Sequence, residues 1–421
     1  MRAAARSASQ CPPIRFQSAK PFSGPVRNTE FPTIPISNAK QEGVGHYQVT
    51  VRNARRSSTA TAYLKPVRGR PNLTVLTDAH STRIVVENGR AVGIEMARKG
   101  QWEIVRAERV IIVASGAIGS PRLLLLSGIG PADHLKSVGI KPVHDLPGVG
   151  ENLQDHLDLY AIAECRGDFT YDNCAKLHRT IWAGLEYLVF KRGPVASTLF
   201  ETGGFWYADA AAKAQKWSDL QFHLGLGSGI EAGVEKLRNA GVTLNSAFLR
   251  PYSRGSVRLA SVEPFAMPLI DPNYWSDERD RLAAIEGLKT AREILRQPAL
   301  EPFVMVERMP GAGTASEAAL VDYAFRTCKT DHHPVGTCRM GIDQLAVVDP
   351  TLRLRGLEGI RICDASVMPR ITSSNTNAPT IMIAEKAADL ILGNELFSAA
   401  HLPNVELQRS SEPSTATVED E

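Results

Sequence analysis

The chain has 421 residues, of which 43% are hydrophobic and 22% are charged, and its formal net charge is +3. This composition is ordinary for a globular protein that is long enough to form two packed domains. The small, dispersed positive charge argues against a nucleic-acid partner. No apolar run reaches the roughly 18 residues of a membrane-spanning helix, so we expect no transmembrane segment.

The first 40 residues differ from the rest in composition. Between Met1 and Thr29 there is no acidic residue, and five basic residues are scattered among Ala and Ser. This pattern is typical of a mitochondrial transit peptide, although Pro12 and Pro13 interrupt any amphipathic helix. We expect residues 1–40 to be disordered or targeting-like. The location of the protein stays open, with the cytoplasm favoured and the mitochondrion as the alternative.

Regular structure is predicted to start near Gly43. Residues 45–53 alternate as a strand does, and residues 55–66 indicate a helix with Ser57 or Ser58 as its N-cap. Three runs rich in β-branched residues then predict strands, with turns at Asn88-Gly89 and Lys99-Gly100: 72–79, 81–100 and 101–115.

An apolar strand over 110–114 opens the next segment. It ends at Ser115-Gly116, and a short buried helix is predicted from Pro121 to Leu126. A buried strand that passes through a tight turn into a helix is the layout of a nucleotide-binding α/β sheet.

The middle of the chain, about 164–245, is predicted to form a substrate domain. Residues 180–194 indicate an amphipathic helix that ends at Gly193-Pro194, and 219–227 and 247–259 suggest an antiparallel sheet. Four aromatic residues could either line a substrate pocket or belong to the core: Phe200, Phe205, Trp206 and Phe222.

Three stretches near the C-terminus carry most of the chemistry. They are DHHPVGTCRMG (331–341), RICDASVMPR (361–370) and SSNTNAPT (373–380). They supply imidazoles, an acidic turn after a strand and an amide-rich loop that opens onto a helix over 380–392. This set is typical of a redox site. Beyond Asn394 the Ser/Pro/Glu-rich tail is predicted to be disordered.

These stretches, together with others in the same order, resemble the glucose-methanol-choline (GMC) flavin oxidoreductases. The resemblance covers roughly Gln41 to Leu392. It is carried by QEGVGHYQVT, RRSSTATAYL, RGRPNLTVLT, GAIGSPRLLLLSGIGP, GVGENLQDHL, RPYSRGSVRL, IDPNYW, HPVGTCRMG, VVDPTLRLRGLEGIRICDASVMP and NTNAPTIMIAEKAADLI.

The resemblance implies FAD as cofactor and oxidation of the CH–OH group of an alcohol, with oxygen or a quinone as electron acceptor. It implies His333 as the base and Asn375 as the second catalytic residue. It also implies that Ser81, Asp364, Ala365, Asn377 and Ala378 bind the cofactor. His332 is then a pocket wall. For Asp364 the alternative is a cap of a turn or helix.

One departure from the family stands beside these matches. No G-x-G-x-x-G follows a buried strand in this sequence, and that element supplies helix N-terminal N–H groups to a dinucleotide diphosphate. The expected fold class is therefore α/β plus α+β, with an incomplete, N-terminally truncated FAD-binding Rossmann-like domain and an antiparallel-sheet substrate domain. The alternative function is a flavin-free fragment with a binding or vestigial role.

The expected domain organisation follows from these segments. Residues 41–160 would be the remainder of the FAD-binding domain, 161–330 the substrate domain with a C-terminal GMC region from about 247, and 331–393 the catalytic segment. Residues 394–421 would be the tail. We expect no metal site, because the adjacent pair His332-His333 lacks an acidic partner at the usual spacing and the six cysteines show no zinc pattern. Free thiols in a reducing compartment are the simpler interpretation of those cysteines.

Overall fold

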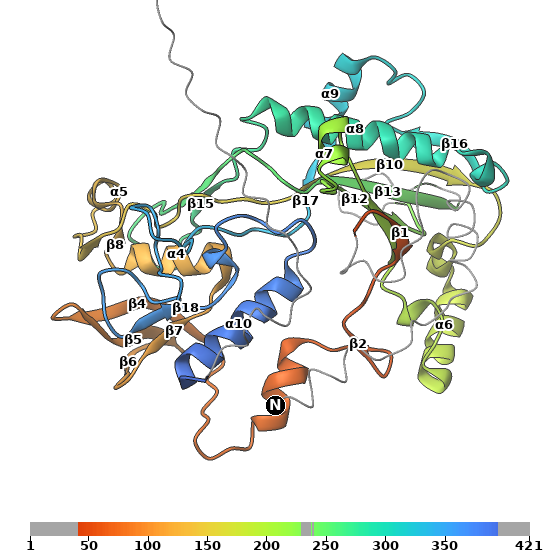
Figure 1. Cartoon of the computed structure of the whole chain (residues 1–421). Coiled ribbons are helices and arrows are strands. Elements are labelled where there is room, and N and C mark those ends of the chain that lie inside the picture. Colours follow the sequence, from red (N-terminus) through yellow and green to blue (C-terminus); the bar gives the residue numbers. More distant parts are fainter. Residues whose placement is uncertain (1–40, 229–236, 238–239, 395–421) are drawn as a thin grey trace, which may run out of the picture.

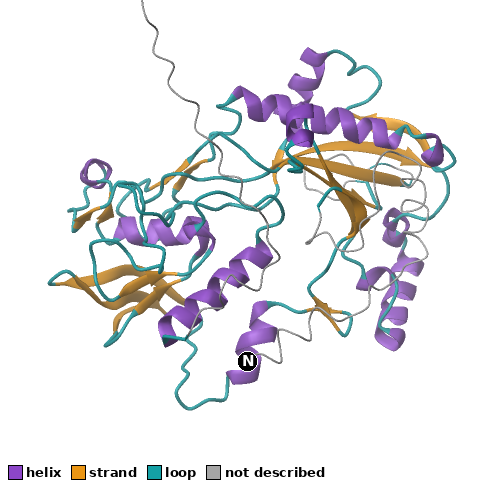
Figure 2. Cartoon of the chain, in the orientation of Figure 1, coloured by secondary structure: helices purple, strands orange, loops and turns teal. Residues whose placement is uncertain are grey.

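A computed structural model of the chain describes residues 41–228, 237 and 240–394. The predicted N-terminal segment 1–40 and the tail after Asn394 lie outside these residues. Helices, antiparallel strands and parallel strands form two regions, each around its own hydrophobic core (Figures 1 and 2). The mixed α/β fold with antiparallel sheets is therefore confirmed.

We call the first part the sheet region. It contains seven strands, all paired antiparallel, in the order β1-β11-β12-β13-β10-β16, with β17 beside β10. The strands are β1 (Gly43–His46), β10 (Leu157–Cys165), β11 (Phe200–Trp206), β12 (Leu220–Gly225), β13 (Gly241–Phe248), β16 (Val304–Met309) and β17 (Lys329–Thr330). β10, β12 and β13 are buried along their whole length, so both of their faces are covered.

Helices cover the sheet region on one side. α8 (Glu278–Leu295) lies across β10 and β13, and α9 (Glu317–Thr327) packs beside it (Figure 1). The carboxylate of Asp277 caps α8 by accepting a hydrogen bond from the Arg279 amide, and Ser316 caps α9. α6 (Leu177–Phe190) is the helix predicted over 180–194. It ends earlier than expected, because Lys191 adopts a left-handed conformation.

Two predictions about strands in this region need correction. The segment predicted as one strand over 45–53 is divided, because β1 ends at His46 and Val51–Arg52 forms the separate strand β2. The segment 247–259 does not form one paired unit. Its first part ends β13, which pairs with β12 as expected, whereas β14 (Ser256–Arg258) pairs with β15 (Leu269–Asp271) in a separate sheet.

We call the second part the α/β region. It consists of the meander β4 (Ala79–Glu87), β5 (Arg90–Arg98) and β6 (Gln101–Arg106), the parallel pair β7 (Ile111–Val113) and β18 (Ile360–Ile362), and the helices α4 (Gly116–Leu126) and α10 (Asn377–Leu392). The turns at Asn88-Gly89 and Lys99-Gly100 are confirmed, with positive φ at all four residues. The strand predicted over 72–79 is wrong, because β4 begins at Ala79, opposite Arg98 at the end of its partner.

Helix α4 begins at Gly116, five residues before the predicted start at Pro121. Proline has no N–H, so inside a helix it leaves the carbonyl four residues earlier without its partner. Here that carbonyl belongs to Ala117, and the buried Thr337 hydroxyl donates to it at 2.5 Å. The replacement hydrogen bond explains why α4 continues through Pro121.

The remaining elements are short. They are β2 (Val51–Arg52), β3 (Arg55–Arg56), η3 (Ala60–Leu64), α3 (Lys65–Val67), β8 (Ile129–Gly130), α5 (Ala132–Ser137), β9 (His144–Asp145), η4 (Tyr171–Ala175), η5 (Pro194–Ala196), α7 (Ala210–Ala214), η6 (Pro298–Leu300) and η7 (Ala365–Val367). The helix predicted over 55–66 corresponds to η3 and α3, and Ser58 Oγ accepts from the Thr61 amide near its start.

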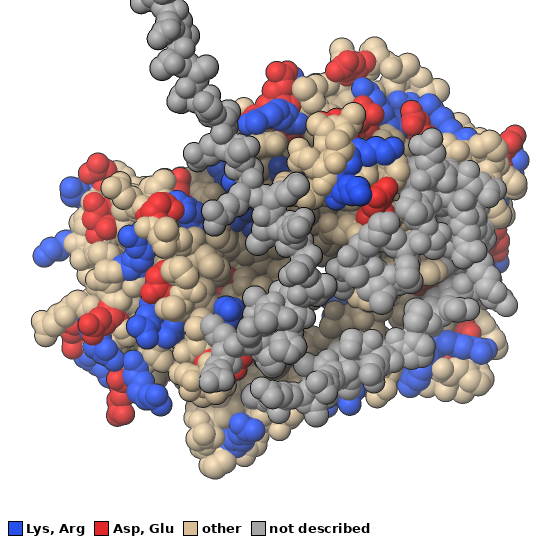
Figure 3. Space-filling view, viewed as in Figure 1, with Lys and Arg blue, Asp and Glu red and all other residues tan. Residues whose placement is uncertain are grey.

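The surface carries both signs of charge. Lys and Arg are interspersed with Asp and Glu over the face shown in Figure 3. None of the helices in the described part of the chain has the length and apolar character needed to cross a membrane.

Candidate active site

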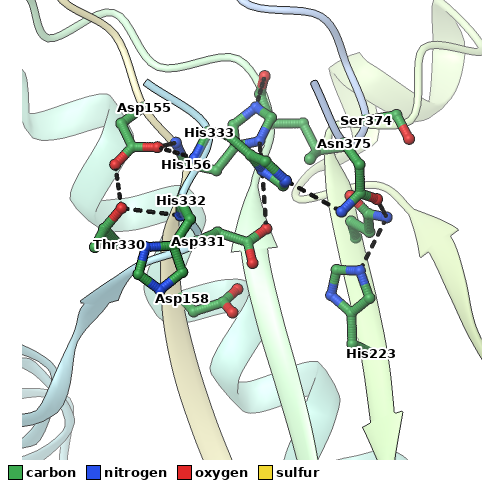
Figure 4. Close-up of polar contacts among 12 residues, drawn as sticks. Asp155, His156, Asp158, His223, Thr330, Asp331, His332, His333, Ser374 and Asn375 are labelled. Carbon is green, nitrogen blue, oxygen red and sulfur yellow. Dashed lines mark hydrogen bonds and ion pairs between the residues drawn. The ribbon is translucent and has the colours of Figure 1, made fainter. Parts of the chain in front are cut away.

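The candidate base, His333, is placed by a short antiparallel ladder. Gln154 and Val335 exchange backbone hydrogen bonds of 3.1 and 2.9 Å, and the Asp331 amide donates to the His156 carbonyl at 2.9 Å. His332 adopts φ 59° between these contacts. The segment 331–335 is longer than the segment 154–156 that it pairs with, and the left-handed backbone of His332 accommodates the difference. It also turns the buried His333 toward His156 (Figure 4).

Asp155 fixes both histidines through the backbone. Its Oδ1 accepts hydrogen bonds from the amides of His156 at 3.0 Å and His333 at 2.8 Å. Its Oδ2 accepts from the Tyr274 hydroxyl at 2.6 Å and from Thr330. Burial and the Asp155 charge raise the pKa of Tyr274, so this phenol stays a donor. Asp155 therefore acts as a positioning residue.

Hydrogen bonds define the tautomers of the two imidazoles. His156 Nε2 lies 3.1 Å from the Leu249 carbonyl and so carries a proton, which leaves a lone pair on its Nδ1. His333 Nε2 lies 3.1 Å from Asn375 Nδ2, which donates to it. The His333 proton is then on Nδ1, which lies 3.1 Å from His156 Nδ1. In this arrangement His333 presents a basic Nε2 toward Asn375.

The surroundings keep the second imidazole uncharged. Burial, and then the neighbouring His333, lower the pKa of His156 to about 3. Burial also lowers the pKa of His223, on β12. For Asp331, burial opposes ionisation, but the imidazoles of His333 and His223 outweigh that cost and hold the pKa of its carboxyl below the usual value.

Asn375 is held from the sheet region. Gln221, on β12, donates to Asn375 Oδ1 at 3.0 Å, and the same Gln221 nitrogen lies 3.3 Å from His223. Tyr47 packs on His223 with ring centroids 5.0 Å apart. The amide of Asn375 therefore has one end fixed by the sheet and the other directed at His333 (Figure 4).

Several residues of this cluster were not predicted from the sequence: His156, Asp331, His223, Gln221 and Asp155. A signal for one of them was present, because His223 is the titratable residue of the strand segment 220–226 (LQFHLGL). Of the four candidate pocket aromatics, Phe205 and Phe222 are buried, Trp206 packs against the core of the sheet region, and Phe200 contacts His223.

Asp364 lies at the N-terminus of α4 rather than open to a ligand. Its Oδ2 accepts from the Gly116 amide at 3.0 Å and from Ser120 Oγ at 2.5 Å. Its Oδ1 accepts from the Ser366 amide and hydroxyl. The carboxylate thus ties the β7–α4 turn to η7, which is the capping role that the sequence left as an alternative. Ala365 contributes its carbonyl to the Gly336 amide at 3.3 Å.

The other cofactor candidates lie in different places. Asn377 and Ala378 form the exposed first turn of α10, directly after Asn375, and no side chain caps this helix. Ser81 is exposed on β4, and no contact joins it to the cluster around His333 among the described residues.

These positions fit one end of FAD. The first turn of a helix has N–H groups without helical partners, so α10 can donate to the electron-rich edge of an isoalloxazine ring. The β7–α4 turn offers nothing comparable to a diphosphate, because its first amide is taken by Asp364. Among the described residues, the chain therefore fits the ring end of FAD and not its diphosphate.

A lone pair on His333 Nε2 faces an amide donor on Asn375 at 3.1 Å. A substrate hydroxyl that replaced this hydrogen bond could pass its proton to the imidazole while its oxygen accepts from the amide, as a base-assisted redox enzyme requires. The sequence pattern of GMC oxidoreductases matches residues 26–158 and 251–384. The chain belongs to this family, as its similarity to curated proteins also shows.

Among these relatives is an oxygen-dependent choline dehydrogenase of Paraburkholderia xenovorans, 38% identical over 401 residues, with 93% of this chain and 71% of the relative covered. Choline dehydrogenase 1 of Chromohalobacter salexigens, also described as oxygen-dependent, is 40% identical over 86% of this chain. An alcohol dehydrogenase [acceptor] of Pseudomonas putida is 41% identical over 85% of it. The chain spans 65% of the length of each of the last two.

Solved structures agree on the fold. Pyridoxine 4-oxidase from Mesorbium loti has a TM-score of 0.80 at 29% identity, covering 92% of this chain and 72% of that one. A formate oxidase of Aspergillus oryzae, from work on FAD modification, has a TM-score of 0.84 at 24% identity, with the same coverage.

Proposed function

We propose that the protein is an FAD-dependent oxidoreductase that oxidises the CH–OH group of an alcohol, with oxygen or a quinone as electron acceptor. The observation that carries the proposal is the pair His333 Nε2 and Asn375 Nδ2, which face one another at 3.1 Å inside a network that fixes both. Membership of the GMC family and the similarity to choline and alcohol dehydrogenases support it.

The residues of the chain have distinct roles in this proposal. His333 Nε2 accepts the hydroxyl proton, and Asn375 Nδ2 donates to the substrate oxygen and holds the carbinol carbon in one orientation. As His333 becomes charged, the Asp331 carboxylate, 3.1 Å from its Nδ1, stabilises the imidazolium. His156 and Asp155 act as positioning residues, because they contact His333 and not the substrate position.

FAD would supply the hydride acceptor when bound. Asn377 and Ala378 would hold its ring edge with the N-terminal N–H groups of α10. Ala365 would lie near the ribityl chain and Ser81 near the adenine, as the family resemblance implies.

The proposal is tested on the full chain in two stages. The chain is first mixed with FAD, and bound flavin is measured by visible absorption after gel filtration. Oxidation of choline and of simple primary alcohols is then followed with oxygen or a quinone analogue. Loss of a general base costs typically about 10²–10⁴-fold in rate, so His333→Gln should lower kcat by that factor.

The neighbouring His332 provides a matched control. It is exposed and lies outside the hydrogen-bond pair, and Asn tolerates its left-handed backbone. His332→Asn should keep kcat within a small factor of the starting protein. Unchanged turnover in His333→Gln would remove the assigned base. A chain that binds no FAD would reject the enzyme and favour the flavin-free alternative.

A further inference from the structure

Behind the base lies a buried group of metal-binding side chains that the proposed reaction does not require as a set. His156, Asp331 and His333 each direct one ligand atom to a common point, and these atoms lie within 4.8 Å of one another. His156 and His333 are 0% and 7% exposed. A second group, Asp158, His223 and Asp331, meets the first at Asp331. Three imidazoles and one further carboxylate, Asp158, thus lie around Asp331 (Figure 4).

The distances fit a tetrahedral metal ion. In such a site the metal–ligand bonds of about 2.0–2.2 Å place neighbouring ligand atoms about 3.3 Å apart. Here His156 Nδ1 lies 3.1 Å from His333 Nδ1, and His333 Nδ1 lies 3.1 Å from Asp331 Oδ2. These two separations are already close to those that a bound zinc ion would impose, and the third lies within 4.8 Å.

Asp331 also lacks the partners that a buried carboxylate normally has. Its Oδ2 is buried, and no hydrogen bond of acceptable geometry reaches it, although His333 Nδ1 is 3.1 Å away. Among the described residues no Lys or Arg forms an ion pair with it. An unneutralised buried charge is costly, so the position favours a cation.

The surroundings of His156 are those of a metal-bound histidine. Its far nitrogen, Nε2, lies 3.1 Å from the Leu249 carbonyl. Metal-bound histidines usually donate their second N–H to a carbonyl or carboxylate, which directs the other nitrogen at the metal. The Asp331 side chain keeps 16% of its surface exposed, which leaves a route from solvent.

We propose that His156 Nδ1, His333 Nδ1 and Asp331 Oδ2 form a three-ligand site for a divalent transition metal, with zinc as the best fit and water as the fourth ligand. From the sequence we expected no metal site, because the adjacent pair His332-His333 lacks an acidic partner at the usual spacing. His156 comes from a segment 177 residues away, and His332 stays outside. An organic ammonium is less suited, because two imidazole nitrogens face the position rather than carboxylates alone, and the one on His156 already carries a lone pair.

Occupation of this site would switch off the base. A metal on Nδ1 forces the remaining proton of a neutral His333 onto Nε2, the atom that has to accept the hydroxyl proton. The metal would therefore inhibit alcohol oxidation. This consequence rests on the proposed function, whereas the metal site itself does not.

The test uses the full chain without an affinity tag, after treatment with a chelator and gel filtration. Zinc is titrated by calorimetry near pH 7 into this protein and into Asp331→Asn, His156→Gln and the control His332→Asn. We expect one zinc per chain, affinity at least about tenfold lower in Asp331→Asn and His156→Gln, and unchanged affinity in the control. The zinc-edge X-ray absorption spectrum of the unaltered protein should show imidazole ligands.

Absence of zinc binding by the unaltered chain would overturn the site, as would full affinity in Asp331→Asn or a spectrum without imidazole. The spectrum decides the matter even where a variant does not fold. Tight binding of choline or another ammonium at this position, with no zinc binding, would assign the cation differently and reject the metal. Zinc binding without any alcohol oxidation would uphold the metal site and reject the proposed function. Alcohol oxidation without zinc binding would uphold the proposed function and reject the metal site.

Discussion

Individual strands and helices of the sheet region and of the α/β region differ in how fully they are buried, although each region has its own core. β10, β12 and β13 are buried at every residue, and α8 seals them with side chains such as Leu288. In the α/β region, β6 is exposed at every residue and Ile112 of β7 is 49% exposed. Parallel strands are normally covered on both faces, and in the pair β7–β18 only Ile112 departs from this rule, because the other five residues are buried.

The two long helices show the same contrast. α8 buries eight of its residues, whereas α10 buries only Ile383 and Ala387 and leaves Met382 56% exposed. The candidate site draws on both regions, with His156 and His223 from the sheet region and the first turn of α10 from the α/β region. The comparison therefore teaches that the base is held by fully buried strands, whereas the proposed cofactor contacts lie on a more exposed helix.

The largest effect on the free energy of unfolding is expected when a buried residue of α8 is compared with an exposed residue of α10. Leu288→Ala should lower the free energy of unfolding by about 2–5 kcal/mol, because it leaves a cavity between α8 and the sheet. Met382→Ala on α10 should change it by no more than about 0.5 kcal/mol. Denaturant titrations followed by circular dichroism measure both. Equal costs would show that α10 is covered as fully as α8.

A smaller effect is expected in the core of the α/β region, where Pro121 lies inside α4. Thr337→Val should cost about 1–3 kcal/mol, because the Ala117 carbonyl loses the donor that replaces the missing N–H of Pro121. Thr337→Ser keeps the hydroxyl and should cost less. Pro121→Ala restores the helical N–H, so it should recover most of the loss in the Thr337→Val background. Purely additive costs in this double-mutant cycle would contradict the assignment.

Local structure was predicted best where it depends only on residues of the same short segment. The turns at Asn88-Gly89 and Lys99-Gly100 follow from residues that tolerate positive φ, and the strand at 110–114 follows from its apolar run. The start of α4 was misplaced because Pro121 stops a helix only if the freed carbonyl has no other donor. That donor, Thr337, lies 220 residues away and cannot be inferred from the local pattern.

The candidate site divides in the same way. His333 and Asn375 were predicted from motifs, and the structure brings them within 3.1 Å. Asp364 was predicted as a cofactor residue or a cap, and its hydrogen bonds show the cap. His156 and Asp331 were missed as partners of the base, because their contact depends on the register between two ladder segments. The residue pattern within either segment does not reveal how the two segments align with one another.

The smallest effect on the free energy of unfolding is expected from the protonation of His156. This residue directly precedes β10 at the boundary of the two regions. The imidazole titrates with a pKa of 6.5 in the unfolded chain, whereas burial and His333 lower its pKa to about 3 in the folded protein. Above pH 6.5 neither state binds the proton, so this group adds no pH dependence. Between those values the unfolded chain binds a proton that the folded protein excludes, so the free energy of unfolding falls as the pH falls.

At about pH 5.5 this difference should cost about 1.4 kcal/mol relative to pH 7.5. His223, whose pKa is also lowered by burial, adds a cost of the same sign. The measurement is the unfolding midpoint at both pH values in the presence of a chelator, with the exposed His178→Gln as a control that should keep the full pH dependence. A folded protein as stable at pH 5.5 as at pH 7.5 would mean that His156 takes up its proton readily, and that the site is more open to solvent than the sheet behind it.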